Sequence, residues 1–282
     1  RRPGRTKPDL VAFGGSSASP FGVLRKRGAA HVIDSDMGTS FAAPLVTRAA
    51  LGLRSMFSAS LHPLTLRCVL IHSADDGGQE ETEVGWGILA DETDLAICPD
   101  NTARVIYQGT LPPKKLLRAR IPVPQGLRGR IQISATLCYA TEISAADPSN
   151  YTNSGVEISY RPNVDKRPVN KQTGRPSTYA ATKPFFRSGG YASEEERRVH
   201  HRKWETVLHN SIRAEASKLS DPSFDLHFIP RQGVGDDKDA RPIRYSMVIS
   251  VHAPKYPDIY DRVLAGFPEL QALTPVVLEA EV

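Results

Sequence analysis

Apolar and polar positions follow two different patterns, and the change comes about a third of the way along the chain. In the first part, short strand-like and helical runs alternate. LVAFG at 10–14 is strand-like, whereas residues 41–56 are apolar over the length of a helix. A second helical pattern at 64–74 follows a His-Pro pair, and proline is tolerated in a first helical turn. A glycine-flanked turn and a short helix are predicted over 84–97, so strand-like and helical runs alternate up to about residue 96.

In the second part the period changes to two, which is the period of strands. Ile131, Ile133 and Ala135 alternate with polar residues, as in a strand with one buried face. Seven runs are strand candidates, at 103–109, 115–123, 129–141, 155–160, 223–230, 243–253 and 274–282. Turn-forming residues separate them, so this part predicts an antiparallel β-sandwich.

Two segments interrupt the strand pattern. Residues 161–190 are rich in proline, lysine and arginine and predict a long basic loop. A helix is predicted over 193–218, because Ser193 and Glu196 form a capping box at its start. The apolar face of this helix would consist of Trp204, Val207 and Leu208.

The composition is that of a globular protein with one large or two ordinary domains. The 282 residues are 40% apolar and 24% charged. We expect two domains, residues 1–98 and 99–282. No stretch approaches the roughly 18 uncharged apolar residues of a membrane span, and the basic N-terminus has no apolar core after it, so no secretory signal is predicted. Because the chain does not begin with Met, we expect it to be a piece of a longer protein.

The net charge of +5 originates in one segment. Residues 161–190 carry seven Lys or Arg and one Asp, so the rest of the chain has a net charge of −1. A nucleic-acid-binding protein would present basic residues on ordered elements with interleaved aromatics, so this distribution argues against nucleic acid as a partner. A solvated insertion is the simplest interpretation of the loop. A contact with a partner or an acidic substrate is the alternative.

The three cysteines are Cys68, Cys98 and Cys138. Their number is odd and no two have CxxC spacing, so they predict neither a disulfide scaffold nor a zinc site. Reduced thiols in a cytoplasmic protein are the simplest interpretation, and a secreted protein is the alternative. The sequence predicts no metal, no cofactor and no membrane partner.

The stretch DMGTSFAAPLV, residues 36–46, places a serine before a run of small apolar residues. Ser40 would lie in the first turn of a helix, where its own N–H is unpaired and the helix dipole favours negative charge. A nucleophile with an adjacent oxyanion donor needs these two properties. Gly38 would let a substrate backbone approach, and Pro44 falls early enough in the helix to be tolerated. The alternative is that Thr39 or Ser40 only caps a buried helix.

GTSFAAPLV, residues 38–46, resembles the serine motif of the subtilisin-like serine peptidases. The usual form of that motif is Gly-Thr-Ser-Met-Ala-(Ala/Ser)-Pro-His-Val, and seven of its nine positions match. Phe41 replaces the usual Met and Leu45 replaces the His, and neither change touches the nucleophile.

Three further segments resemble motifs of the same family, in the same order. KPDLVAFGG at 7–15 is similar to Lys-Pro-(Asp/Glu)-(hydrophobic)-x-Ala-Pro-Gly, with Phe13 where proline is usual. LTLRCVLIHSAD at 64–75 resembles the family helix that ends in a Thr-Ala or Ser-Ala pair. GWGILADETDLA at 85–96 resembles the closing Gly-x-Gly-x-(hydrophobic)-(Asn/Asp) segment.

The resemblance implies part of an α/β catalytic domain with a parallel sheet, and a Ser-His-Asp mechanism. Ser40 would attack a peptide carbonyl, a histidine would act as base, and an aspartate would orient that histidine. The Ser40 N–H and an asparagine side chain would hold the oxyanion, and Gly38, Thr39 and Pro44 would support the motif. In this family the Asp, His and Asn precede the serine. The expected partners are therefore a polypeptide substrate and a missing N-terminal part that holds these residues.

The histidines and aspartates of the chain itself lack the settings that the family uses. His31 lies on a predicted strand without a His-Gly-Thr-His setting. Asp34 and Asp36 lack Asp-(Ser/Thr)-Gly and are expected to line the loop near Ser40. The other histidines lack the setting as well: His62, His72, His200, His201, His209, His227 and His252. His201 and His209 could share one face of the predicted helix, although a solvated helix is favoured over a metal site. We therefore expect little or no peptidase activity from this chain alone.

Residues 129–160 loosely resemble the jelly-roll-like domain that many large subtilases carry after the catalytic part. Asp147-Pro148 and Asn153 stand at the positions of its turn and polar stretch. In the family such a domain packs on the catalytic part and supports its folding or adjusts substrate access. The alternative function is a catalytically inactive subtilase-like scaffold whose β-sandwich binds a partner protein. The intact Gly-Thr-Ser favours a live enzyme.

Overall fold

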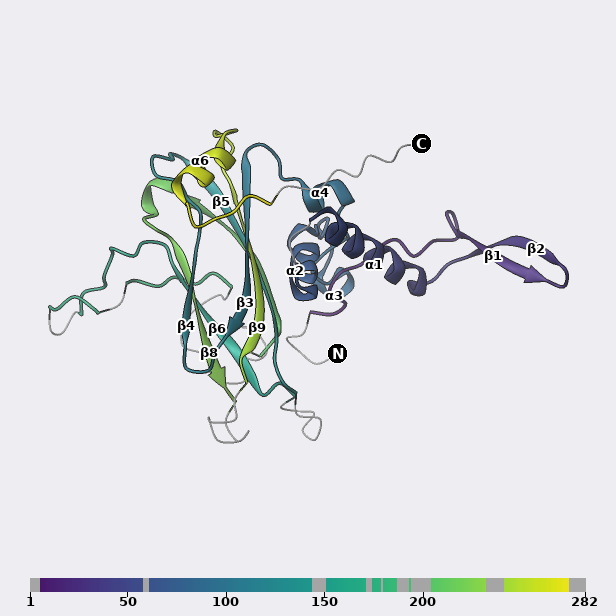
Figure 1. The fold of residues 1–282 in the computed structure, drawn as a ribbon, viewed down its shortest axis with the longest axis horizontal. Helices are drawn as coiled ribbons and strands as arrows, with labels where there is room; N and C mark the ends of the chain where they lie inside the picture. Colours follow the sequence, from purple (N-terminus) through teal and green to yellow (C-terminus); the bar gives the residue numbers. More distant parts are fainter. Residues whose placement is uncertain are drawn as a thin grey trace. The chain divides into compact units, whose positions relative to one another are not determined.

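The chain folds into two compact units, which are drawn in Figure 1. The computed structural model describes residues 6–57, 61–143, 151–170, 174–178, 180–186, 193, 204–231 and 241–273. We call the unit with described residues within His62–His72 and Cys98–Leu273 the sandwich unit. The unit with described residues within Thr6–Leu61 and Ser73–Ile97 is the serine unit.

The sandwich unit consists of two antiparallel sheets. Its strands are β3 (Thr102–Leu111), β4 (Leu116–Arg120), β5 (Arg130–Ala140), β6 (Ser154–Arg161), β7 (Val207–Glu215), β8 (Ser223–Pro230) and β9 (Ile243–His252). One sheet has the order β3-β9-β5-β7 and the other β4-β8-β6. Successive strands alternate between the two sheets, which is the connectivity of a jelly roll. The predicted antiparallel sandwich is confirmed, and the run predicted at 274–282 lies outside the described residues.

Alternating side chains of the strands form the core between the sheets. Ile131, Ile133 and Ala135 of β5 are at most 2% exposed, which confirms the buried face predicted for this strand. Phe224 and Leu226 of β8 in the other sheet are fully buried in the same cluster. The short helix α6 (Ile259–Gly266), which the sequence pattern did not predict, lies at one end of the sandwich (Figure 1) and adds its buried residues to this core.

The helix predicted over 193–218 is wrong for residues 207–215, which form β7. Val207 and Leu208 are buried, but on a strand whose backbone pairs with β5 from Cys138↔Val207 to Arg130↔Glu215. Pairing along the whole strand outweighs the local helical pattern. Glu196 of the predicted capping box lies outside the described residues.

The helix predicted at 64–74 is confirmed as α2 (Pro63–Ser73). Residues 62–72 belong to the sandwich unit, and α2 lies on the outward face of the four-stranded sheet. The Cys68 thiol donates to the carbonyl oxygens of Thr136 and Ser246 at 3.3 and 3.5 Å. The Thr65 hydroxyl donates to Gln108 Oε1 at 2.6 Å. The sandwich therefore includes a helix from the first part of the sequence.

The serine unit contains a hairpin and three helices in its described residues. β1 (Phe21–Arg27) and β2 (Ala30–Asp36) pair antiparallel, and Gly28 takes a positive φ of 61° in the turn between them. The helices are α1 (Thr39–Met56), α3 (Glu81–Val84) and α4 (Glu92–Ala96). The helix predicted over 41–56 is thus confirmed, with two additional residues at its start.

The parallel sheet that the resemblance implied is absent from the described residues of the serine unit. The segment predicted as a strand at 10–14 makes a single parallel bridge, Val11↔Ile88. Its hydrogen bonds run from Val11 N to Gly87 O and from Leu89 N to Val11 O, at 2.9 and 2.8 Å. A parallel sheet needs further strands linked by crossovers, and the described residues of this unit form a parallel pairing at Val11 and Ile88 alone. Within the described part of the chain, no helix is both long and apolar enough to span a membrane.

Candidate functional site

Two glycine backbones meet directly before Ser40. The Gly38 N–H donates to the Gly14 carbonyl oxygen at 2.8 Å. A Cβ on Gly14 would stand only 2.8 Å from Gly38 O, so a larger residue there would displace the turn. Gly15 has φ +85°, a conformation that favours glycine. The segment 7–15 therefore fixes the backbone from which α1 starts.

Ser40 is the second residue of α1, and its side chain is exposed. The N-cap position is Gly38 and no side chain caps the helix, so neither Thr39 nor Ser40 serves as the cap. No acceptor in the described part of the chain takes the Ser40 N–H. The exposed hydroxyl and the available N–H lie together at the positive end of an 18-residue helix. A nucleophile and an oxyanion donor require this arrangement.

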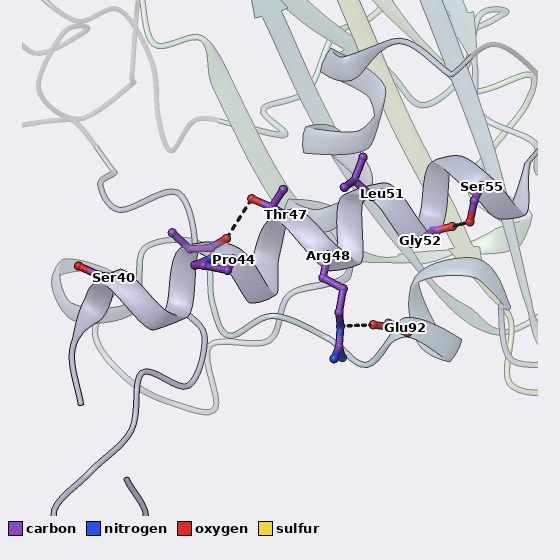
Figure 2. Close-up of a pocket in the computed structure, with 9 residues that line it drawn as sticks. Ser40, Pro44, Thr47, Arg48, Leu51, Gly52, Ser55 and Glu92 are labelled. Atoms are coloured by element: carbon purple, nitrogen blue, oxygen red, sulfur yellow. Dashed lines mark hydrogen bonds and ion pairs between the residues drawn. The ribbon is translucent and has the colours of Figure 1, made fainter. Parts of the chain in front are cut away.

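An open groove runs along α1 from Ser40 (Figure 2). Its lining residues follow one face of the helix and end on α4: Ser40, Ala43, Pro44, Thr47, Arg48, Leu51, Gly52, Ser55 and Glu92. Arg48 Nε pairs with Glu92 Oε1 at 2.9 Å across the groove. Only Ala49 and Leu53 of α1 are buried, and Leu51 is 61% exposed. The sequence pattern suggested a buried helix, but this face of α1 has no cover in the described residues.

Pro44 lies inside α1 and has no N–H to donate. In a regular helix the N–H of residue 44 would donate to the carbonyl oxygen of Ser40, four positions earlier. The helix tolerates the proline because it falls within the first two turns. The backbone around Ser40 is therefore less constrained by helical hydrogen bonds than the rest of α1.

Three aromatic rings connect the start of α1, next to Ser40, to the hairpin. The Phe21 ring of β1 stacks on Phe41 with centroids 5.2 Å apart, and it lies 5.6 Å from the Phe13 ring. Phe13 and Phe41 are the two aromatic departures from the family motifs. The sequence showed each departure singly, and only the fold brings them together through Phe21.

No general base lies beside Ser40 in the described residues. His31 is the only histidine in the described part of the serine unit, and it stands on β2 opposite Lys26, near the hairpin turn. Five residue steps along the strand lead from His31 to Asp36, a distance of about 16 Å. Residues 1–97 contain no asparagine that could complete an oxyanion hole.

Asp34 and Asp36 lie on β2 rather than in a loop near Ser40, so that expectation is wrong. Asp34 pairs with Arg27 at 3.0 Å, and Asp36 pairs with Arg25. Both partners come from β1, so these carboxylates join the two strands of the hairpin. They are committed to exposed ion pairs and do not orient a histidine.

The remaining described histidines lie in the sandwich unit. His209 is on the strand β7, which excludes the considered possibility that it shares a helical face with His201. His200 and His201 lie outside the described residues. His72 is buried on α2, and the others are His62 before α2, His227 on β8 and His252 on β9. Among the described residues, no group of three or more His, Cys, Asp or Glu could hold a metal ion.

Residues 2–87 match the model of the Subtilase family. This range includes Ser40 and the segments 7–15 and 64–75. The match supports the resemblance to subtilases, and a protease-type enzyme in general, for this part of the chain. No curated protein matches the chain.

Several solved structures are similar to part of the chain. The VP2 subviral particle of infectious bursal disease virus is 12% identical at a TM-score of 0.27, with 57% of this chain and 35% of that chain covered. The structure of the Gx strain of the same virus is 11% identical at a TM-score of 0.25, with 56% of this chain and 34% of that chain covered. The STIV MCP is 9% identical at a TM-score of 0.17, with 53% of this chain and 47% of that chain covered. This chain spans about a third of the length of the two bursal disease virus chains, and TM-scores this low establish no shared fold.

Proposed function

We propose that this chain is the nucleophile-bearing part of a subtilisin-like serine endopeptidase. Ser40 is the nucleophile that attacks a peptide carbonyl of a polypeptide substrate, and its own N–H is one oxyanion donor. The observation that carries the proposal is the position of Ser40. It has an exposed hydroxyl and an N–H without an acceptor in the described residues, at the start of a helix in a segment that matches the Subtilase family.

The general base, its aspartate and the oxyanion asparagine belong to a preceding part of the longer protein. Two features support this assignment. His31 is the only histidine in the described part of the serine unit, and it lies on β2 near the turn of the hairpin. The groove face of α1 exposes Leu51 and the apolar residues around it, and a further part of a catalytic domain would cover such a face. This chain alone is therefore inactive as a peptidase.

A catalytically inactive scaffold with a protein-binding sandwich is the alternative. The absence of a base beside Ser40 in the described residues favours it. Against it stands the Gly14–Gly38 contact, which keeps the serine at the helix start although the fold does not use the serine as a cap.

A fluorophosphonate probe tests the proposal, because it reacts only with an activated serine. We expect the longer natural protein to be labelled at Ser40 and this chain to remain unlabelled. Ser40→Ala in the longer protein should abolish labelling. Ser55→Ala changes another serine on the same groove face of α1 and should leave labelling intact. If the longer protein is not labelled, the inactive scaffold replaces the peptidase as its function.

A further inference from the structure

A chain of hydrogen bonds between imidazoles and hydroxyls lies under α2 on the outward face of the four-stranded sheet. His72 of α2 contacts the Thr136 hydroxyl of β5 through Nδ1 at 2.8 Å. Its Nε2 contacts the Ser250 hydroxyl of β9 at 2.7 Å. The Thr136 hydroxyl also contacts His209 Nδ1 of β7 at 2.7 Å. One buried imidazole thus joins a helix to the two central strands of the sheet and, through Thr136, to its edge strand.

Both groups of the described residues that act electrostatically on His72 are basic. They are Arg104 of β3 and His209 of β7, and the His209 ring lies 6.0 Å from the His72 ring. β5 and β9 present the neutral hydroxyls of Thr136 and Ser250. On α2 itself the neighbour is Cys68, whose thiol donates to backbone carbonyls. No carboxylate of the described residues compensates a positive charge at this position.

The hydrogen bonds do not prevent protonation of His72, but its surroundings do. A doubly protonated ring could donate to both hydroxyls while Thr136 donates onward to His209, so every polar group would keep a partner. The cost lies in the charge, which would be buried beside two basic groups. Desolvation by burial, then repulsion from Arg104 and His209, therefore hold the pKa of His72 well below its usual value of 6.5.

We propose that α2 stays docked on the sandwich only while His72 is neutral, so that acidification releases the helix from the sheet. This inference goes beyond the proposed function and does not depend on the chemistry of Ser40.

The direction of the pH dependence follows from the two states of His72. In the released helix the ring is solvated and takes up a proton below about pH 6.5, whereas the docked ring resists it. Docking is therefore at full strength above about pH 6.5 and weakens as the pH falls below that value. The equilibrium constant for docking falls roughly tenfold per pH unit until the pH reaches the pKa of the docked ring.

Hydrogen exchange of the full chain tests the proposal, with rates corrected for the intrinsic effect of pH. The opening equilibrium of the α2 amides should rise about 30-fold between pH 7.5 and pH 5.0. The amides of β5 in the core should keep their protection over the same range. His72→Gln keeps a donor and an acceptor but cannot become charged, so its α2 opening should not change with pH. His62→Gln alters an exposed histidine just before α2 and should behave like the wild type.

A second variant guards against a folding defect of His72→Gln. Arg104→Gln removes the stronger of the two repulsive influences on His72, so it should reduce the rise at pH 5.0. Equal α2 protection at both pH values in the wild type would overturn the proposal, as would an equal loss in β5. An acid effect that persists in His72→Gln and vanishes in His209→Gln would assign the switch to His209 and overturn it as well.

Discussion

At the scale of single residues, the contact between Gly14 and Gly38 determines where Ser40 stands. Gly14→Ala is expected to destabilise the chain by about 1–3 kcal/mol, because the added methyl would stand 2.8 Å from Gly38 O. Chemical denaturation of the wild type and of Gly14→Ala measures the difference in their free energies of unfolding. In the longer protein the same substitution should also slow fluorophosphonate labelling of Ser40.

Gly52→Ala is the matched control for this substitution. Gly52 lies inside α1 on the groove face, with open space where a Cβ would stand. Alanine is favoured over glycine in a helix by about 1 kcal/mol, so this variant should be more stable than the wild type. Equal destabilisation by both substitutions would show that the Gly14–Gly38 contact has no special role.

At the scale of secondary-structure elements, one carboxylate joins the three strands of the smaller sheet. Asp225 of β8 is 2% exposed, accepts from Arg118 Nε of β4 at 2.7 Å and pairs with Arg161 of β6. Burial by itself would raise its pKa, but hydrogen bonds from the two arginines outweigh burial and lower the pKa below its usual value of 3.8. The charged form of Asp225 therefore stabilises the sheet.

Asp225→Asn should destabilise the chain by about 3 kcal/mol at neutral pH, because Arg161 would keep a largely buried charge without its partner. The lowered pKa fixes the pH window of this loss. The wild-type advantage should be complete above about pH 3.8, the usual pKa of the carboxyl, and shrink as the pH falls below that value. Urea denaturation of the wild type and of Asp225→Asn at pH 7, 5 and 3 measures this advantage.

Glu92→Gln is the control, because it removes an exposed ion pair with Arg48 and should change stability by less than about 1 kcal/mol. An advantage that stays constant down to pH 3 would contradict the role of the carboxylate.

The success of the sequence pattern also differs between elements. Strands with strict alternation, such as β5, were predicted because burial of one face leaves a period of two. β7 was predicted as a helix because Trp204, Val207 and Leu208 have helical spacing, and only pairing with β5 reveals the strand. Ser40 and Gly38 could be named as site candidates from the sequence because they are close together in it, whereas the contact of Gly38 with Gly14 could not. The Phe13–Phe21–Phe41 cluster and the partners of His72 could not be predicted, because residues distant in sequence form them.

At the scale of the whole molecule, three passages of the chain between the two units lie within the described residues, near residues 61, 72 and 97. A fragment of residues 98–282 would contain all strands of the sandwich but lack α2. We expect a fragment of residues 62–282 to unfold at a temperature at least about 4 °C higher, because α2 covers the polar face that carries Thr136 and Ser250. Circular dichroism melting of the two fragments measures this difference. Equal melting temperatures would mean that α2 does not stabilise the sheet.

The origin of α2 also bears on how such a protein can arise. A gene segment that encodes only residues 98–282 would carry the jelly roll without the helix that contacts it. Recombination at that boundary would give one protein that contains the sheet without α2 and another that contains α2 without the sheet. We therefore expect the serine-bearing segment and its sandwich to be inherited together, and to vary in step across species at the α2 contact.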